Sequence, residues 1–265
     1  MRAARRALQS KKVGHGGTLD PAATGLLVLA AGSATRLLQF VEKQEKVYRT
    51  IFIFGKRSAT HDLECEELET VPAAPFSRKA VEAVLPSFCG EIQQRPPRFS
   101  AKKIAGNKAC TLARKGLDFH LPACQVLCKR IEIVRFDFPK IELRLECGPG
   151  FFVRALCRDL AEKLGTAAVC AEIFRERIGR FKVESAVSLS QISLENLLPP
   201  RPEFFNFPAV QISDDQLPAI KRGQKIFLPA LFNSGQKLAA AFLEKELVAV
   251  GEIAGDFFQP RKVLA

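Results

Sequence analysis

Alternation of apolar and polar residues predicts three strands in the first half of the chain and just beyond it. In Lys140–Cys147 every second residue is apolar, starting at Ile141, and the residues between them are charged. A period of two is typical of a strand with one buried face in an antiparallel or mixed sheet. Val47–Phe54 becomes apolar on both faces toward its end, which predicts a central strand, and Ile131–Phe138 is predicted as the third.

Two further segments have the apolar spacing of helices. Ser77–Leu85 opens with a residue type that caps helices, carries its apolar residues on one face, and is expected to end before Pro86. In Val153–Leu164 every fourth residue from Leu156 onward is a leucine. Gly165 follows directly and is predicted to close this helix in the left-handed conformation.

The pattern changes near residue 200. Leu198–Pro208 is rich in proline and is interpreted as a linker. Beyond it, Lys237–Ile253 predicts two short strands around a turn at Glu244–Glu246, and no long helix is indicated. We therefore expect an α+β body followed by a small all-β appendage.

The chain carries a large excess of positive charge. It has 40 lysine and arginine residues against 28 aspartate and glutamate residues, a formal net charge of +12 over 265 residues. Such a surface favours a polyanionic partner, most commonly nucleic acid, because basic side chains displace counterions from phosphates. A basic protein that merely stays soluble is the open alternative, and charge does not distinguish DNA from RNA.

The remaining composition is that of an ordinary globular protein, with 47% hydrophobic and 26% charged residues. No apolar run reaches the roughly 18 residues that cross a bilayer. The basic first twelve residues are not followed by the apolar stretch of a signal peptide. We therefore expect a cytoplasmic protein with no membrane partner.

Eight cysteines are present without a metal-ligand spacing. No two form a C-x-x-C pair, the closest being Cys124 and Cys128, and none of the three histidines lies at a ligand spacing from a cysteine. Cys147, Cys157 and Cys170 lie among apolar residues, where a free thiol packs as a small hydrophobic group. We predict reduced, structural cysteines and no metal site.

A dense cluster of turn-forming residues surrounds Asp20. Glycines at positions 14, 16, 17 and 25, together with Pro21, predict a tight and exposed loop. The proline holds Asp20 in an extended conformation, so that its carboxylate projects from the chain. The alternative is structural, since an Asp–Pro pair often caps and opens a helix. The loop lacks the lysine and the spacing of a Walker motif.

The loop and the chain around it resemble the TruB-type tRNA pseudouridine synthases. The segment KKVGHGGTLDPAATGLLVLAAGSATRLLQF is similar to the family's signature over its full length. Four more blocks follow in the family's order: its lysine–tyrosine motif, proline-rich segment, arginine motif and last catalytic stretch, at Lys46–Glu64, Gln93–Gly116, Gly148–Ala168 and Ile173–Ile192.

This resemblance implies an α+β fold with two domains. A mixed β-sheet catalytic domain with a central cleft is expected at residues 1–200, and a small C-terminal all-β PUA-like RNA-binding domain at residues 207–265. The family usually begins with a strand and a lysine–proline–glycine segment before a basic helix. We expect that N-terminal segment to be missing here, because the sequence starts within the basic helix.

The resemblance also implies which residues act. The family's catalytic aspartate corresponds to Asp20, and its active-site tyrosine and arginine to Tyr48 and Arg154. A histidine near the flipped nucleotide corresponds to His15, and an apolar residue of the pocket to Ile173. The reaction breaks the N1–C1′ bond of uridine, rotates the uracil and rejoins it through C5. A carboxylate serves as nucleophile or stabilises charge at C1′, and a base must remove the C5 proton.

Tyr48 is distinctive because the chain has 21 phenylalanines, no tryptophan and a single tyrosine. Its ring is expected to stack on the extruded uracil and its hydroxyl to add a hydrogen bond. The alternative is a strand tyrosine whose hydroxyl points into solvent. Phe152 and Phe99 lie where the family commonly has tyrosine; Phe152 is expected to keep a stacking surface for the substrate but lacks the hydroxyl.

Basic residues beside the proline-rich turn are expected to contact phosphates of a folded RNA loop; they are Arg95, Arg98, Lys102 and Lys103. The resemblance implies isomerisation of uridine in tRNA, by family habit uridine 55 of the T loop. It also implies a monomer that binds the T-arm without metal or organic cofactor. Two alternatives remain: a non-catalytic RNA-binding or tRNA-folding protein on the same scaffold, and a related synthase acting on a different RNA.

Overall fold

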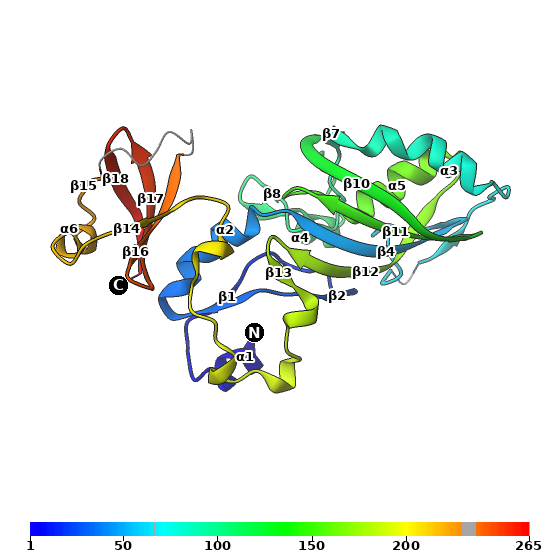
Figure 1. Ribbon diagram of the computed structural model, residues 1–265. Helices are drawn as coiled ribbons and strands as arrows, with labels where there is room; N and C mark the ends of the chain where they lie inside the picture. Colours follow the sequence, from blue (N-terminus) through cyan, green and yellow to red (C-terminus); the bar gives the residue numbers. More distant parts are fainter. Residues whose placement is uncertain (66, 229–236, 265) are drawn as a thin grey trace. The chain divides into compact units, whose positions relative to one another are not determined.

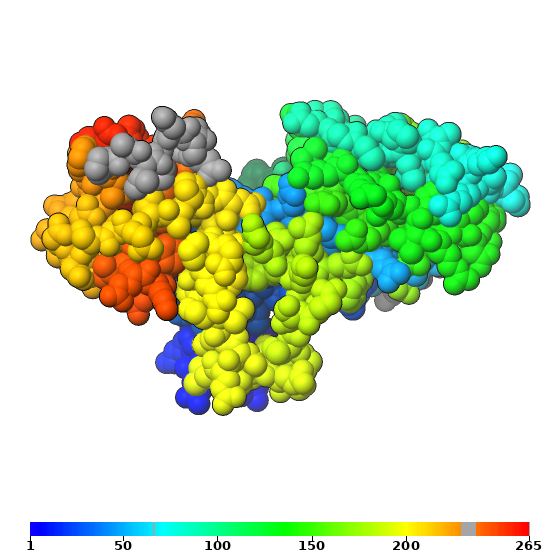
Figure 2. All heavy atoms as spheres, viewed as in Figure 1, coloured from blue at the N-terminus to red at the C-terminus, as the bar shows by residue number. Residues whose placement is uncertain are grey.

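The structure consists of two compact units. A computed structural model describes residues 1–65, 67–228 and 237–264 (Figures 1 and 2), so part of the predicted C-terminal domain, residues 229–236 and 265, lies outside the described residues. One unit, which we call the sheet unit, comprises Leu19–Leu26 and Glu45–Ile178. The other, which we call the terminal unit, comprises Met1–Thr18, Leu27–Gln44 and Gly179–Ala265.

A mixed sheet forms the centre of the sheet unit (Figure 1). Its strands are β2 (Ala23–Gly25), β4 (Lys46–Phe54), β7 (Gly90–Gln94), β10 (Cys124–Asp137), β11 (Lys140–Cys147) and β12 (Ala168–Ile178). The order is β12-β4-β11-β10-β7 with antiparallel neighbours, and β2 pairs with β12 in parallel. All three predicted strands are confirmed. β11 has the predicted bounds, β4 is central as its two apolar faces indicated, and β10 is longer than expected.

One face of this sheet carries the core. On β11, Ile141, Leu143, Leu145 and Cys147 are at most 1% exposed, while the residues between them are only half-buried or exposed. These side chains pack with buried residues of two helices, α3 (Arg78–Val84) and α5 (Val153–Lys163). Burying one such aliphatic side chain stabilises the fold by about 1.5–3 kcal/mol. We call this the inner face of the sheet and the opposite one the outer face.

Both predicted helices are present. The hydroxyl of Ser77 caps α3 by accepting a backbone hydrogen bond at 3.3 Å, and Figure 2 shows this helix, in cyan, at the surface. The α-helix ends before Pro86, as expected. Pro86 itself lies in the first turn of the 3-10 helix η2 (Leu85–Phe88), where its missing N–H is not needed. Gly165 follows α5 at φ +73°, which confirms the predicted left-handed cap.

The smaller elements of the sheet unit connect these strands. They are the paired β5 (Lys56–Arg57) and β6 (Glu69–Thr70), the paired β8 (Lys103–Ile104) and β9 (Asn107–Lys108), and α4 (Ala109–Arg114). Over the described ranges of both units, no helix combines the length and the hydropathy that crossing a membrane requires.

The terminal unit begins with short elements. They are α1 (Arg2–Ala7), β1 (Val13–His15), β3 (Leu29–Ala31), η1 (Gly32–Leu37), α2 (Leu38–Glu42), β13 (Phe181–Lys182), η3 (Val183–Ser185), η4 (Leu189–Gln191) and η5 (Leu194–Asn196). β1 and β3 are antiparallel, and Ala4, Leu8 and Val13 form a small buried cluster beside them. The basic first helix is therefore anchored by its few apolar residues.

The C-terminal part of the terminal unit is a five-stranded sheet with the order β14-β16-β17-β18-β15. Its elements are β14 (Ala209–Gln211), α6 (Leu217–Lys221), β15 (Ile226–Phe227), β16 (Leu238–Leu243), β17 (Glu246–Ala254) and β18 (Phe257–Val263). The predicted hairpin is confirmed, with Glu244 at φ +53° in its turn. The description as all-β omitted α6, a helix of five residues that carries Pro218 in its first turn.

The proline-rich segment Leu198–Pro208 is more ordered than a linker. It contains the 3-10 helix η6 (Pro202–Phe204), and Phe205 is buried in one cluster with Phe242. The ring of Phe205 also stacks on that of Phe207, with centroids 5.0 Å apart. The prolines correctly indicated an irregular backbone, but the phenylalanines among them attach it to the neighbouring sheet.

Candidate active site

Asp20 lies in a turn that leads into a strand. The backbone N–H of Ala23 donates to the carbonyl of Asp20 at 2.9 Å, and the next element is β2. The interpretation of Asp20–Pro21 as a helix cap is therefore wrong, because the turn closes onto β12 through β2 instead. The side chain of Asp20 is 38% exposed, so its carboxylate is accessible to a ligand.

Arg154, in the first turn of α5, orients this carboxylate. Its Nε donates to Oδ2 of Asp20 at 2.7 Å, and only 4% of the arginine side chain is exposed. The two remaining guanidinium nitrogens donate to the carbonyl oxygens of Thr60 at 2.8 Å and Phe99 at 2.9 Å. Arg154 is therefore not a solvated helix arginine. The guanidinium is held from three sides, and a buried charge needs such partners to be tolerated.

A second aspartate completes the arrangement. Oδ2 of Asp62 lies 3.4 Å from Nη1 of Arg154, and its side chain is 9% exposed. Its Oδ1 accepts from the hydroxyl of Thr60 at 2.5 Å and from the backbone N–H of Glu64 at 3.1 Å. Arg154 thus bridges a buried carboxylate and an accessible one. Asp62 was not singled out in the sequence, because one aspartate in a polar loop has no distinguishing pattern.

Tyr48 lies on β4 with its hydroxyl withdrawn from solvent. Burial raises its pKa, and the neighbouring Cys147 raises it further; the charge and hydrogen bond of Arg175 act in the opposite direction. The charge of Asp20 also reaches the phenol and raises its pKa. Tyr48 therefore keeps its proton at neutral pH, close to Asp20 and hydrogen-bonded to Arg175. A hydroxyl in open solvent, the alternative interpretation, is excluded.

Arg175 on β12 is a second arginine that sequence reasoning missed. It is 1% exposed, and its Nε donates to the carbonyl oxygen of Leu26 at 2.8 Å. Its own carbonyl oxygen accepts from the backbone N–H of Leu26 at 2.8 Å. A Cβ on Gly25 would lie 2.5 Å from that oxygen, and Gly25 also has φ +94°, so only glycine fits. Arg175 therefore fixes the end of the segment that carries Asp20.

The other expected contacts lie near the same network in the sheet unit. Ile173 is half-buried on β12 and packs against the core, in register with Thr50 of β4. Phe152 precedes α5, and its backbone N–H and carbonyl bind the side-chain amide of Gln94 at 2.8 and 3.0 Å. Gln94 is 1% exposed and was not predicted either. This amide pair fixes the backbone just before Arg154.

His15 belongs to the terminal unit, where it lies on β1 opposite Leu29. Its Nδ1 is buried without a hydrogen-bond partner. The expected phosphate contacts belong to the sheet unit: Arg95 and Arg98 line a cavity described below, and Lys102 and Lys103 are exposed at and just before β8.

Cys147, Cys157 and Cys170 pack among apolar side chains, as predicted. Cys128, Cys147, Cys157 and Cys170 are at most 3% exposed in the core of the sheet unit. Burial raises the pKa of Cys128 and of Cys170 to about 12, so these thiols stay protonated and unreactive. Across the described part of the chain, no three histidine, cysteine, aspartate or glutamate side chains gather as a metal site would require.

Known proteins are similar to this chain in sequence and in fold. Residues 5–153 match the family model described as TruB family pseudouridylate synthase, N-terminal domain. A tRNA pseudouridine synthase B of Caulobacter vibrioides is 36% identical over 276 residues, which cover 98% of this chain and 89% of the relative. One of Synechocystis sp. is 38% identical over 237 residues, covering 86% of this chain and 80% of the relative.

Two solved structures share the fold. A chain of the archaeal box H/ACA sRNP Nop10-Cbf5 complex has a TM-score of 0.74 at 24% identity, covering 100% of this chain and 80% of its own. A chain of a Cbf5-Nop10-Gar1 complex has a TM-score of 0.72 at 23% identity, covering 98% and 79%. The sequence relatives and the family model together establish that this chain belongs to the TruB family of pseudouridylate synthases, which are isomerases.

Proposed function

We propose that this enzyme isomerises uridine to pseudouridine in tRNA, at uridine 55 of the T loop, with Asp20 as its catalytic carboxylate. The observation that carries the proposal is the accessible carboxylate of Asp20, held by the buried guanidinium of Arg154 at 2.7 Å. Similarity to proteins named tRNA pseudouridine synthase B supports tRNA as the substrate.

The reaction is an isomerisation, so atoms and electrons balance within the nucleotide. The N1–C1′ bond breaks, a C5–C1′ bond forms, the C5 proton leaves and a proton returns to N1. Asp20 acts at C1′, either as nucleophile or by stabilising positive charge there. Arg154 holds the carboxylate in place, and no change of oxidation state calls for a redox cofactor.

The residues around Asp20 receive roles in binding the flipped nucleotide. The ring of Tyr48 stacks on the uracil, and Ile173 and Phe152 form apolar walls for the base. His15 stays a predicted contact of the nucleotide. Asp62 acts through Arg154 and is a positioning residue.

The T-arm is proposed as the bound part of the tRNA. Arg95, Arg98, Lys102 and Lys103 would contact its phosphates, and the division into a catalytic domain at 1–200 and a PUA-like RNA-binding domain at 207–265 belongs to the same proposal. The five-stranded C-terminal sheet supports that second domain. One chain carries Asp20, Arg154 and Tyr48 together, so the proposal requires only a monomer, acting in the cytoplasm.

One assay tests the proposal. Purified protein is incubated with an unmodified tRNA transcript, and pseudouridine is mapped by reverse transcription after carbodiimide treatment. We expect one new stop, at uridine 55, with the wild-type protein and none with Asp20→Asn. A modification at another uridine would refute the assigned position. Tight tRNA binding without any pseudouridine would instead favour a tRNA-folding role.

A further inference from the structure

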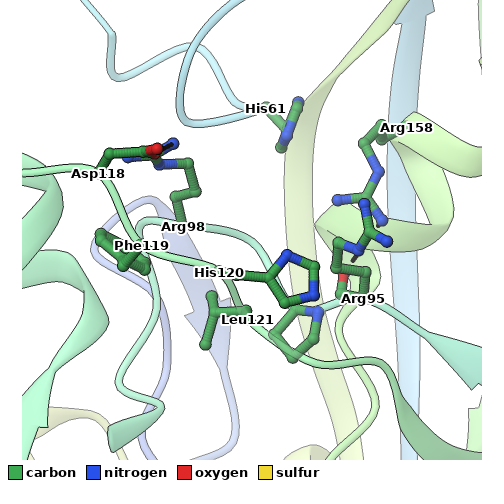
Figure 3. A pocket seen from close by; sticks show the side chains of 9 residues that line it. His61, Arg95, Arg98, Asp118, Phe119, His120, Leu121 and Arg158 are labelled. Atoms are coloured by element: carbon green, nitrogen blue, oxygen red, sulfur yellow. Dashed lines mark hydrogen bonds and ion pairs between the residues drawn. The ribbon is translucent and has the colours of Figure 1, made fainter. Parts of the chain in front are cut away.

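A cavity with a strongly basic lining opens in the sheet unit beside the Asp20 site. Its volume is about 450 Å³. Figure 3 shows side chains from several segments turned toward one space. The basic and aromatic residues among them are His61, Arg95, Arg98, Phe119, His120 and Arg158. Three guanidinium groups around one open cavity make it a candidate site for an anion.

Short covalent links tie this cavity to the Asp20 site. Arg98 directly precedes Phe99, whose carbonyl oxygen accepts a hydrogen bond from Arg154 at 2.9 Å. Arg158 follows Arg154 by four residues on α5, about one helical turn later. A ligand in the cavity is therefore a close neighbour of whatever Asp20 binds.

Contacts within the protein fix the position of the Arg98 guanidinium at the cavity. Its guanidinium lies 4.6 Å from the ring centroid of Phe119, and its Nη2 donates to the carbonyl oxygen of Leu117 at 2.9 Å. Its Nη1 donates to Asp118 at 3.2 Å, but the side chain of Asp118 is 97% exposed. Exposed ion pairs are weak, so a phosphate group can replace this carboxylate without moving the arginine.

The other cationic groups reinforce the positive potential. Arg158 pairs with Asp159 and donates to the carbonyl oxygen of Arg95 at 3.0 Å. Arg95 itself is exposed and lines the cavity. Burial, followed by the charges of Arg158 and Arg154, lowers the pKa of His61 to about 4. This imidazole is therefore neutral at physiological pH and able to donate one hydrogen bond.

We propose that this cavity binds a phosphate of the substrate RNA strand next to the target uridine. The inference rests on RNA being the substrate. Guanidinium groups match the non-bridging oxygens of a phosphodiester, and their fixed positions would set the register of the strand relative to Asp20. The phosphate takes the place of Asp118 on Arg98, with Arg95 as its second cationic neighbour. Free inorganic phosphate has the same chemistry and is tested separately.

The test measures the affinity of the full chain for an unmodified tRNA transcript across a range of salt concentrations. All variants carry Asp20→Asn, so that turnover does not change the RNA. Arg98→Gln is expected to weaken binding about tenfold, the cost of one charge-assisted contact. It should also reduce the slope of log affinity against log salt by about 0.7–0.9, the effect of one lost phosphate contact.

Two further variants sharpen the test. Asp118→Asn removes the competing carboxylate and should tighten binding by about two- to fivefold. Arg130→Gln is the matched control, because Arg130 is also an exposed arginine paired with a carboxylate, Glu132, but lies on β10 outside the cavity. Its affinity and salt slope should equal those of the parent protein. Equal melting temperatures across the series exclude a folding defect.

The outcomes separate this inference from the proposed function. If Arg98→Gln behaves like Arg130→Gln, the subsite is refuted, while pseudouridine formation by the wild-type protein still supports the enzyme. If the wild-type protein makes no pseudouridine, the proposed function fails, and the binding series still decides the subsite. A third outcome is that inorganic phosphate, at constant ionic strength, raises the melting temperature of the protein with Arg98 but not of the Arg98→Gln variant, while both bind tRNA with equal affinity. The cavity then holds free phosphate, and the assignment to RNA is overturned.

Discussion

The two faces of the central sheet place arginine and carboxylate side chains in opposite environments. On the outer face, Arg144 pairs with Glu176 at 2.8 Å and Arg177 pairs with Glu146 at 2.8 Å, and these side chains are 22–43% exposed. On the side of the inner face, where α5 packs, Arg154 is 4% exposed and pairs with Asp20 at 2.7 Å. The arginine–carboxylate distances on the two faces are alike, but the arginine of the inner pair is much less exposed to water.

An exposed pair and a buried pair of the same length contribute differently to the protein. In water the attraction between two charges is screened, and an exposed pair contributes about 0–1 kcal/mol. A buried guanidinium must have its partners, because an uncompensated buried charge is far more costly. The network around Arg154 therefore fixes geometry and leaves one carboxylate accessible, as the proposed role of Asp20 requires. The exposed pairs of the outer face only orient side chains on the surface of the sheet.

The largest effect is expected from Asp20→Asn, which removes the charge of the accessible carboxylate and keeps its shape. Turnover should fall below about one per cent of wild type, because a nucleophile or charge-stabilising group is lost. Affinity for tRNA should stay within a few-fold, since phosphate contacts dominate it. Single-turnover pseudouridine formation and a binding titration measure the two quantities. Residual turnover well above one per cent would refute the assignment of Asp20.

Tyr48→Phe removes only the hydroxyl, which is hydrogen-bonded to Arg175. If the hydroxyl takes part in proton transfer, the single-turnover rate should fall by roughly two to four powers of ten, with tRNA binding retained. The melting temperature should change little, because the ring still packs against the core. Nearly normal activity would reduce Tyr48 to a stacking surface for the uracil.

How far the sequence predicts this structure depends on whether the signal is local. The strand at Lys140–Cys147 and the cap at Gly165 were predicted, because a period of two and a single glycine are visible within a few residues. Asp62, Arg175 and Gln94 were missed. Each acts through a partner distant in sequence: Arg154, Leu26 and Phe152.

In the candidate site, too, local patterns in the sequence did not reveal contacts between distant residues. Asp20, Tyr48 and Arg154 came from the resemblance to a family; the structure pairs Asp20 with Arg154, and the charge of Asp20 reaches Tyr48. Spacing alone offered a helix cap as the alternative for Asp20, and that interpretation was wrong. Burial of a charged residue is decided by what packs over it, which no local pattern of charges reveals.

Asp62→Asn tests the buried end of the network. The substitution keeps the shape but removes the charge that lies 3.4 Å from Arg154. The guanidinium should then shift relative to Asp20, and small misplacements of catalytic groups cost up to about a hundredfold in rate. We expect the maximal rate to fall by about ten- to a hundredfold, with the substrate concentration at half-maximal rate unchanged.

A matched control for this change is Asp137→Asn on β10, where the aspartate is 73% exposed and pairs with Arg135. It should leave the maximal rate unchanged. If both asparagine variants lose activity equally, the effect is general loss of charge. If Asp62→Asn retains full activity, Asp62 has no positioning role.

The smallest effect is expected on the outer face, from Arg144→Gln. The side chain of Arg144 is 43% exposed, and it lies between Glu176 at 2.8 Å and Glu132 at 3.8 Å. The hydrogen bond that Arg144 donates to Glu176 raises the pKa of Arg144, but screening by water limits what this pairing contributes to folding. We expect the free energy of unfolding, measured by urea titration, to fall by no more than about 1 kcal/mol, and the loss to shrink further in high salt. Turnover should not change. A loss of several kcal/mol would mean that the pairs of the outer face are coupled as tightly as those around Arg154, and the contrast between the two faces would fail.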